Sequence, residues 1–328
     1  MKKITILTFD SAAATTATAP MDVFLFAGSL YNTSNGKEIT PFFEVEVVTP
    51  DGKPAICSNN LSITPHRSFE EVEKTDLILI SAIWDIETTL SKHKKSIATL
   101  IEHYERGTNL GGLCTGAMIL AETGLLDGKD ATTHWSVTDV FRQLYPKVLL
   151  KPERLFTDAG DLFCSGGFNA CIDLSLYLIE RYLGCEIAAQ TAKAMIFDIG
   201  RVSQTPYTCF NVQRNHNDKS ILESQRQIEE KFNENINVEI LAQENGMSRR
   251  TFERRFKNAT GDTPLMYLQR TRVEEAKKIL ETKDKSFDEI CYHVGYEDSS
   301  FFRKIFTKHA GLRPGEYRKR FQRSWDFR

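Results

Sequence analysis

The chain has 328 residues, which exceeds the size of about 250 to 300 at which a single hydrophobic core stops growing, so we expect two domains. Hydrophobic residues make up 41% of the chain and charged residues 26%, a composition that excludes a disordered chain. Because no apolar run approaches the roughly 20 residues of a membrane span, we expect no membrane partner.

The formal net charge of −2 is unevenly distributed along the chain. Residues 220–328 hold 22 Lys and Arg against 18 Asp and Glu, whereas residues 1–219 hold 20 against 26. This asymmetry predicts a basic module at the C-terminal end, attached to an acidic one.

The seven cysteines include no Cys-x-x-Cys pair of the kind that binds a metal or carries redox chemistry. We therefore predict no metal site and no cofactor. A reducing, cytoplasmic location suits this cysteine pattern best.

Through the first two hundred residues, short apolar runs alternate with longer amphipathic stretches. We predict buried strands at 3–9, 43–49, 77–80 and 109–113, a hairpin from 154–156 and 162–164, and helices at 20–30, 91–106, 116–125 and 171–183. Alternation of strand and helix favours an α/β doubly wound, flavodoxin-like domain over residues 1–200, with a parallel sheet covered on both faces.

Residues 201–224 are polar and aperiodic, and we expect them to form a linker. Beyond them no strand pattern returns, so residues 225–328 predict an all-α domain. Its sequence repeats itself around two glycine turns, at Gly246 and Gly295, which indicates two helix-turn-helix units. The matched positions after the turns are Phe256, Gly261, Pro264 and Tyr267 in the first copy and Phe306, Gly311, Pro314 and Tyr317 in the second.

Local signals mark where helices of this domain begin. Ser248 and Asp298 are the predicted N-caps of the helices that follow the two turns. Pro264 and Pro314 predict the first helical position of the next helix in each copy.

The helix after each turn carries two phenylalanines four residues apart, the first pair being Phe252 and Phe256. These rings place the core on one face, so the polar residues of the opposite face are exposed. Arg can bond to guanine, Ser to several base edges and Lys to phosphate, so this face predicts binding to double-stranded DNA. The predicted DNA-binding residues are Arg249, Arg250, Glu253, Arg254, Lys257, Ser299, Ser300, Arg303 and Lys304.

The segments GMSRRTFERRF (246–256) and GYEDSSFFRKIF (295–306) resemble the two halves of the AraC/XylS DNA-binding domain. The resemblance covers about residues 225–322. It implies a seven-helix module in which one linking helix, about 265–282, holds two recognition helices in successive major grooves. It also implies a transcription regulator, with a homodimer and contact with RNA polymerase as further expectations.

In the first domain, Cys114 stands between a predicted strand and a predicted helix, in GGLCTG (111–116). Such a turn exposes a side chain at the carboxyl edge of a parallel sheet, and the helix dipole there favours a thiolate. His134, in ATTHW (131–135), is expected beside it. Cys114, Thr115 and His134 are the candidate ligand-binding residues, and Cys114 and His134 the candidate catalytic residues; a buried structural thiol is the plain alternative.

These segments, with LAETGLLDG (120–128) and SGGFNACID (165–173), resemble the PfpI-like, class I glutamine amidotransferase-like domain. That domain is fused to AraC modules in the GlxA-like group, and the resemblance spans roughly residues 3–200. In catalytic relatives an acid from the loop after the first strand lies near the cysteine. The stretch 11–20 holds no carboxylate, and Asp10 and Asp22 lie outside it.

We therefore expect a DNA-binding regulator controlled by a small-molecule effector sensed near Cys114, and we lean away from an enzyme. The alternative is a PfpI-like hydrolase or hydratase that uses the Cys114 and His134 pair, fused to a DNA-binding module. A pure protein-interaction scaffold, as a third hypothesis, predicts no salt-dependent DNA affinity and conflicts with the basic helix faces.

Overall fold

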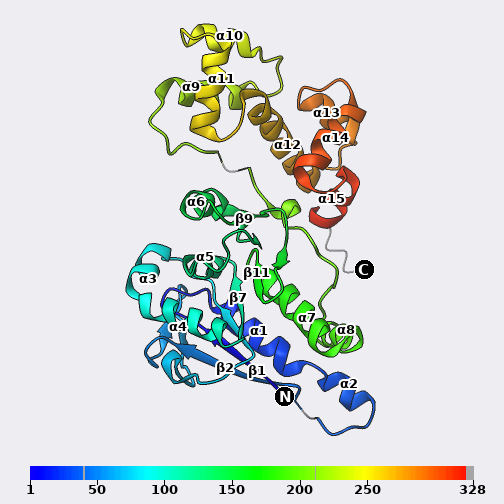
Figure 1. Cartoon of the computed structure of the whole chain (residues 1–328). Helices are drawn as coiled ribbons and strands as arrows, with labels where there is room; N and C mark the ends of the chain where they lie inside the picture. Colours follow the sequence, from blue (N-terminus) through cyan, green and yellow to red (C-terminus); the bar gives the residue numbers. More distant parts are fainter. Residues whose placement is uncertain (40, 211, 323–328) are drawn as a thin grey trace. The chain divides into compact units, whose positions relative to one another are not determined.

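The computed structural model describes residues 1–39, 41–210 and 212–322, and the chain divides into two compact units (Figure 1). Unit 1 is Met1–Gln204 and unit 2 is Thr205–Arg328. The stretch 201–224, expected as a linker, is shared between them, and its last residues form the start of a helix at Lys219. Within the described ranges, no helix combines the length and apolar character needed to cross a membrane.

A seven-stranded sheet forms the centre of unit 1, in the order β10-β11-β7-β6-β1-β2-β5. All neighbouring pairs are parallel except β10 and β11, which form the predicted hairpin. The strands of this sheet are β1 (Lys2–Leu7), β2 (Phe43–Thr49), β5 (Arg67–Ser68), β6 (Leu77–Ile80), β7 (Asn109–Leu113), β10 (Phe156–Asp158) and β11 (Leu162–Ser165). Two small sheets pair β3 (Ala55–Ile56) with β4 (Ser62–Ile63), and β8 (Asp130–Ala131) with β9 (Leu149–Leu150).

Apolar side chains of the central strands alternate between two clusters, one on each face of the sheet. On β6, Leu77 and Leu79 belong to one cluster, and Ile78 and Ile80 belong to the other. Helices α1, α7 and α8 contribute to the first cluster and α4, α5 and α6 to the second, which confirms the doubly wound fold. The helices of unit 1 are α1 (Ala14–Phe26), α2 (Ser29–Ser34), α3 (Ile86–Lys92), α4 (Lys94–Glu105), α5 (Gly116–Glu122), α6 (Thr138–Leu144), α7 (Ala170–Leu183) and α8 (Cys185–Ala194).

Two predicted helices of unit 1 have different bounds in the structure. The helix expected over 20–30 is α1, which begins at Ala14 and carries the buried Pro20 in its interior. The helix expected over 91–106 is divided at His93, whose ring packs 5.1 Å from that of Phe9. In both places the structure buries side chains against residues distant in sequence, a contact that the periodicity of the sequence does not report.

Seven α-helices make up the described part of unit 2, the number implied by the resemblance. They are α9 (Lys219–Glu230), α10 (Val238–Glu244), α11 (Arg249–Thr260), α12 (Pro264–Thr282), α13 (Phe287–His293), α14 (Ser299–Ala310) and α15 (Pro314–Phe321). The predicted caps are present, since Ser248 accepts the Thr251 N–H and Asp298 accepts those of Ser300 and Phe301.

The long helix α12 joins the two halves of unit 2. Near its start, Tyr267 and Leu268 belong to a core shared with α9, α10 and α11. Near its end, Ile279 and Leu280 belong to a second core, shared with α13, α14 and α15. One helix therefore carries both helix-turn-helix units, with α11 and α14 as their second helices (Figure 1).

Candidate DNA-reading surface and candidate effector site

Helix α11 is amphipathic, with its two phenylalanines in the core and its basic residues in solvent. The rings of Phe252 and Phe256 are fully buried, and their centroids lie 5.7 Å apart. On the opposite side, Arg250, Arg254 and Lys257 are exposed. This face, the reading face of α11, presents guanidinium groups that suit guanine and an ammonium that suits phosphate.

Two other arginines of α11 are held by carboxylates. Arg249 Nε donates to Glu253 Oε1 over 2.9 Å, an i,i+4 pair on the reading side. Arg255 turns the other way, because its Nε and Nη2 donate to the two carboxylate oxygens of Asp218 over 2.9 and 2.8 Å. Arg255 therefore holds α11 against the start of α9 and offers a natural control for its neighbour Arg254.

Helix α14 repeats the arrangement with different chemistry. Phe302 and Phe306 are fully buried, and the ring of Tyr296 stacks on Phe302 at 4.6 Å between centroids. The Arg303 guanidinium lies 5.0 Å from the ring centroid of Phe287, which orients it at the edge of the exposed face. Of the four predicted DNA-binding residues here, Ser299 is half-buried and the others are exposed, namely Ser300, Arg303 and Lys304.

Two exposed residues of α14 were missed by the sequence analysis. Phe301 has 52% of its surface exposed, and Lys308 lies one turn beyond Lys304 on the same side. A helical wheel centred on Phe302 would have found Phe301, because successive residues of an α-helix are about 100° apart. The sequence analysis named only polar residues on this face and therefore left Phe301 out.

A buried arginine on α12 fixes the second turn against the first half of unit 2. Arg272 is only 7% exposed and donates to the carbonyl oxygens of Phe232 and Glu234 over 2.6 and 2.8 Å. Gly295 completes the junction, because its φ is +82° and a Cβ there would stand 2.5 Å from the Asn233 carbonyl oxygen. The two recognition helices are thus carried on one rigid frame.

In unit 1, Cys114 follows β7 in a strained turn with φ of +54°. Its side chain packs with Ala13, Ala82 and Phe168, and only 3% of the residue is exposed. This burial raises the pKa of the thiol to about 12, and the hydrogen bonds from Thr115 oppose the shift only in part. This shift opposes the thiolate that the sequence predicts at the start of α5, because burial disfavours the charged form of the thiol.

The Thr115 hydroxyl is engaged by backbone. Its Oγ1 donates to the Ile83 carbonyl oxygen over 2.6 Å and accepts the Ile83 N–H over 2.9 Å. Thr133, in the ATTHW segment, donates a hydrogen bond from Oγ1 to the Cys114 carbonyl oxygen over 2.9 Å. Both threonines thus hold the backbone around Cys114.

His134 shares a neighbour with Cys114, because its ring lies edge-on to Phe168 at 6.1 Å. The Ser136 N–H donates to His134 Nδ1 over 3.2 Å, so Nδ1 is an acceptor and the neutral ring carries its proton on Nε2. Desolvation lowers the pKa of His134. Cys114 and the neutral His134 therefore both contact the ring of Phe168.

Residues 2–181 match the model of the DJ-1/PfpI family, and residues 241–320 match that of a helix-turn-helix domain. The first match covers more than half of the 328 residues. The chain belongs to the DJ-1/PfpI family.

Relatives that match this DJ-1/PfpI chain over most of its length are named as HTH-type transcriptional regulators. The HTH-type transcriptional regulator CdhR of Pseudomonas aeruginosa is 28% identical over 83% of this chain and 80% of its own length. The HTH-type transcriptional regulator GlxA of Rhizobium meliloti is 24% identical, over 85% of this chain and 86% of its own. A crystal structure of an AraC family transcriptional regulator from Pseudomonas putida covers 60% of this chain and all of that one, with 20% identity and a TM-score of 0.52, which shows a shared fold.

Around Cys114, this DJ-1/PfpI domain has apolar side chains at the place where the sequence resemblance implies a catalytic acid. Ala13, from the stretch 11–20, packs beside the thiol. Asp10 is directed elsewhere, since its Oδ1 accepts the Ile56 N–H over 2.9 Å, and Asp22 is exposed on α1. In the described part of the chain, no group of three or more His, Cys, Asp or Glu residues is placed to hold a metal ion.

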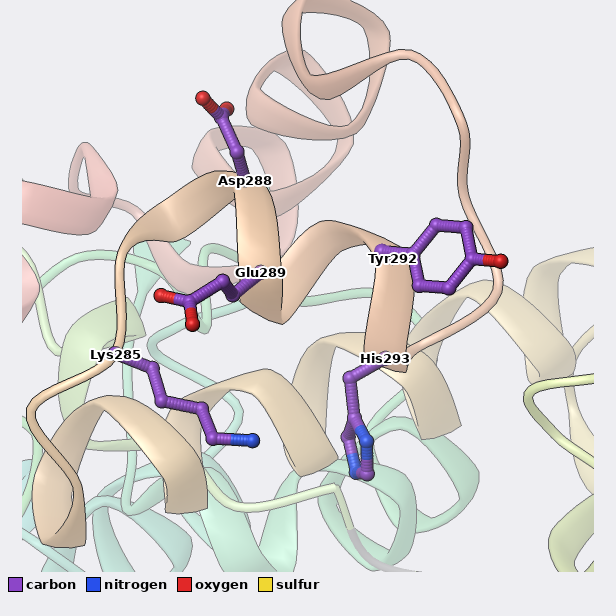
Figure 2. Close-up of a pocket in the computed structure, with 5 residues that line it drawn as sticks. All are labelled: Lys285, Asp288, Glu289, Tyr292 and His293. Carbon is purple, nitrogen blue, oxygen red and sulfur yellow. The ribbon is translucent and has the colours of Figure 1, made fainter.

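A separate hollow of about 510 Å³ lies on unit 2 of this DJ-1/PfpI chain, along α13 (Figure 2). Its carboxylate Glu289 already accepts from the backbone and hydroxyl of Ser286, which caps the helix. In Figure 2 the side chains of Asp288 and Tyr292 extend outward, so the hollow is open to solvent. We assign it to the outer surface of the second helix-turn-helix unit rather than to an effector.

Proposed function

We propose that this protein is a sequence-specific DNA-binding transcription regulator whose DNA affinity is set by a small molecule bound in unit 1. The observation that carries the proposal is the pair of helix-turn-helix units on α12, each with an exposed polar face opposite a buried phenylalanine pair. Two recognition helices on one frame read two half-sites about one helical turn apart, on the same side of the duplex.

The chemistry of the reading faces supports DNA as the partner. Arg250 and Arg254 are exposed on α11, and among the described residues neither has an ion pair like that of Arg255 with Asp218, so each can form a bidentate contact with guanine. Lys257 and Lys304 are exposed and suit phosphate oxygens, which makes the binding sensitive to salt.

Selection of bound duplexes from random DNA by the full-length protein tests this function. We expect a bipartite consensus, and footprinting that shows two protected segments on one side of the helix. An insertion of about five base pairs between the half-sites should abolish protection of one of them, because it turns that half-site to the far side. Failure to enrich any sequence would refute the proposed function.

The effector site that we propose includes Cys114, Thr115 and His134 and favours binding over turnover. Burial raises the pKa of Cys114 to about 12, which favours the neutral thiol at pH 7. A neutral His134 with Nδ1 as acceptor has no carboxylate orienter in the described contacts of its ring. The alternative, a hydrolase or hydratase based on the same pair, needs a thiolate that this environment disfavours.

Comparison of wild type with Cys114→Ser separates the two readings of this site. DNA-binding titrations with and without each member of a metabolite library should find a compound whose effect, about 1 to 3 kcal/mol, is lost in the variant. Basal DNA affinity and fold should be unchanged. Multiple-turnover release of ammonia or acid that disappears in Cys114→Ser would instead support the enzyme.

The proposal extends to assembly and location. Val140 and Leu144 lie one turn apart on α6 with 49% and 53% of their surfaces exposed, an apolar stripe that suits a second copy of the chain. Sedimentation of wild type beside Leu144→Asp tests the homodimer, which the added charge should weaken.

The cysteines bear on the location of the protein. All seven are free thiols, which suits a regulator in the reducing cytoplasm. RNA polymerase is a further proposed partner there.

A further inference from the structure

Helix α14 exposes an aromatic ring on the side that carries its polar residues. Phe301 has 52% of its surface exposed, whereas the next residue, Phe302, is fully buried. The ring is therefore available to a partner that approaches the polar face of α14, because helix geometry places Phe301 beside the exposed lysines of that face.

The position of Phe301 in the helix is well defined. Asp298 is the N-cap, and its Oδ1 accepts the N–H groups of Ser300 and Phe301 over 2.8 and 3.0 Å. Phe301 therefore lies in the first turn of α14, one turn before the exposed Lys304. In a helix-turn-helix unit, the first residues of the second helix are those that meet base edges in the major groove.

The ring is also supported by the fold. Tyr296 lies 6.1 Å from Phe301 between ring centroids, and Tyr296 is itself stacked on the buried Phe302 at 4.6 Å. The Arg272 guanidinium lies 4.7 Å from the Tyr296 centroid and holds it from the α12 side. Phe301 thus rests against a fixed neighbour, which limits the entropy lost when it meets a partner.

The corresponding positions of α11 carry different chemistry. After its N-cap Ser248, α11 has Arg249, Arg250 and Thr251, where α14 has two serines and Phe301. Arginines discriminate guanine by hydrogen bonds to O6 and N7, whereas a phenylalanine has no hydrogen bond to give. The apolar group that a base pair presents in the major groove is the 5-methyl of thymine.

We infer that α14 recognises a thymine in its half-site through contact of the Phe301 ring with the 5-methyl group. This inference rests on the proposed DNA-binding function and adds the base class that the second reader selects. It makes the two half-sites chemically different, with guanine contacts from α11 and a methyl contact from α14. The site is therefore asymmetric for one chain.

Removal of a single methyl group tests the contact. In the duplex selected by the full-length protein, each thymine is replaced singly by deoxyuridine, and the dissociation constant is measured for wild type and Phe301→Ala. At one thymine we expect wild type to lose about three- to tenfold in affinity, the equivalent of one or two buried carbon groups. Phe301→Ala should bind the unmodified duplex more weakly by a similar factor and be indifferent to the same replacement.

Lys304→Ala is the matched control on the same helix. It should weaken binding to every duplex and still distinguish thymine from deoxyuridine as wild type does. Circular dichroism and the thermal midpoint should be unchanged in Phe301→Ala, because the ring is half-exposed.

The outcomes separate the inference from the proposed function. If a consensus is selected but no methyl removal depends on residue 301, the inference is wrong and the DNA-binding function stands. If Phe301→Ala leaves the affinity for every duplex unchanged, the ring serves another partner and the inference is again wrong. If no consensus emerges, the proposed function itself fails.

Discussion

The side-chain amide of Gln204 donates a hydrogen bond to the carbonyl oxygen of Thr133 over 2.8 Å. Thr133 in turn donates from Oγ1 to the carbonyl oxygen of Cys114 over 2.9 Å. Gln204 is only 2% exposed and is the last residue of unit 1. Two hydrogen bonds therefore connect the backbone at Cys114 to the last residue of unit 1.

The residues after Gln204 are bound within unit 2. The Thr208 carbonyl oxygen accepts from Lys277 Nζ over 2.8 Å, and the Phe210 N–H donates to Glu274 Oε2 over 3.2 Å. Both partners lie on α12, which carries the two recognition helices. The segment 204–210 is thus hydrogen-bonded within unit 1 at its start and to α12 within unit 2 further along.

Gln204→Ala should reduce the free energy of unfolding of unit 1 by about 1 to 3 kcal/mol, because buried oxygens of Thr132 and Thr133 lose their donor. Denaturant titration measures this loss, and hydrogen exchange should accelerate around residues 132–134. Gln243→Ala, at an exposed position of α10, is the control that should change neither. Unchanged stability of the Gln204 variant would show that this bond does not hold the end of unit 1.

Arg254→Ala should weaken specific DNA binding by about 1 to 3 kcal/mol and relax the preference at one base position. Arg255→Ala, one residue along, should leave that preference intact because Arg255 is bound to Asp218. Lys257→Ala should weaken binding to all sequences and reduce the salt slope by about one. Loss of base preference in the Arg255 variant rather than the Arg254 variant would reverse the assigned faces of α11.

Gly295→Ala should lower the free energy of unfolding of unit 2 by about 2 to 5 kcal/mol, through the positive φ and the clash of a Cβ with Asn233. Gly246→Ala is the matched change in the first turn. There φ is +65° but nothing lies within 4 Å of the added carbon, so we expect about 1 to 2 kcal/mol from the backbone alone. Equal losses in the two variants would argue against a tight junction at Gly295.

Cys114 should react slowly with iodoacetamide at neutral pH, and exposed Cys185 should be modified first. Because its folded pKa of about 12 exceeds the ordinary value of 9.0, the buried thiol contributes stability below pH 9 that is lost as the pH rises towards 12. Mass spectrometry of alkylated peptides over a pH series gives the rates. Faster modification of Cys114 than of Cys185 at pH 7 would favour the enzyme alternative.

Features set by local rules could be predicted from the sequence. The caps at Ser248 and Asp298 and the proline starts of α12 and α15 depend on a few neighbouring residues, and all are present. Strands β1, β2, β6 and β7 of the central sheet were found because buried parallel strands read as continuous apolar runs, whereas the two-residue edge strand β5 (Arg67–Ser68) gives no such signal and was missed.

Features set by distant contacts could not be predicted in the same way. The pKa of Cys114 depends on Ala13, Ala82 and Phe168, which are brought together only by the folded sheet. The start of α1 was placed at Pro20 from the spacing of apolar residues, whereas the helix begins at Ala14 and buries Ala14, Thr16 and Ala17. Exposure of Phe301 follows from which side of α14 faces the core, and the sequence analysis, which looked for polar residues on the face opposite Phe302 and Phe306, did not consider an apolar one there.

The equilibrium affinity of the full-length protein for its selected duplex, relative to a scrambled duplex of equal length, tests the central claim most directly. We predict that the selected duplex binds at least about 10³-fold more tightly, and that both affinities fall steeply as salt increases from about 50 to 200 mM. A ratio near one, or affinities indifferent to salt, would contradict a DNA-reading role for α11 and α14.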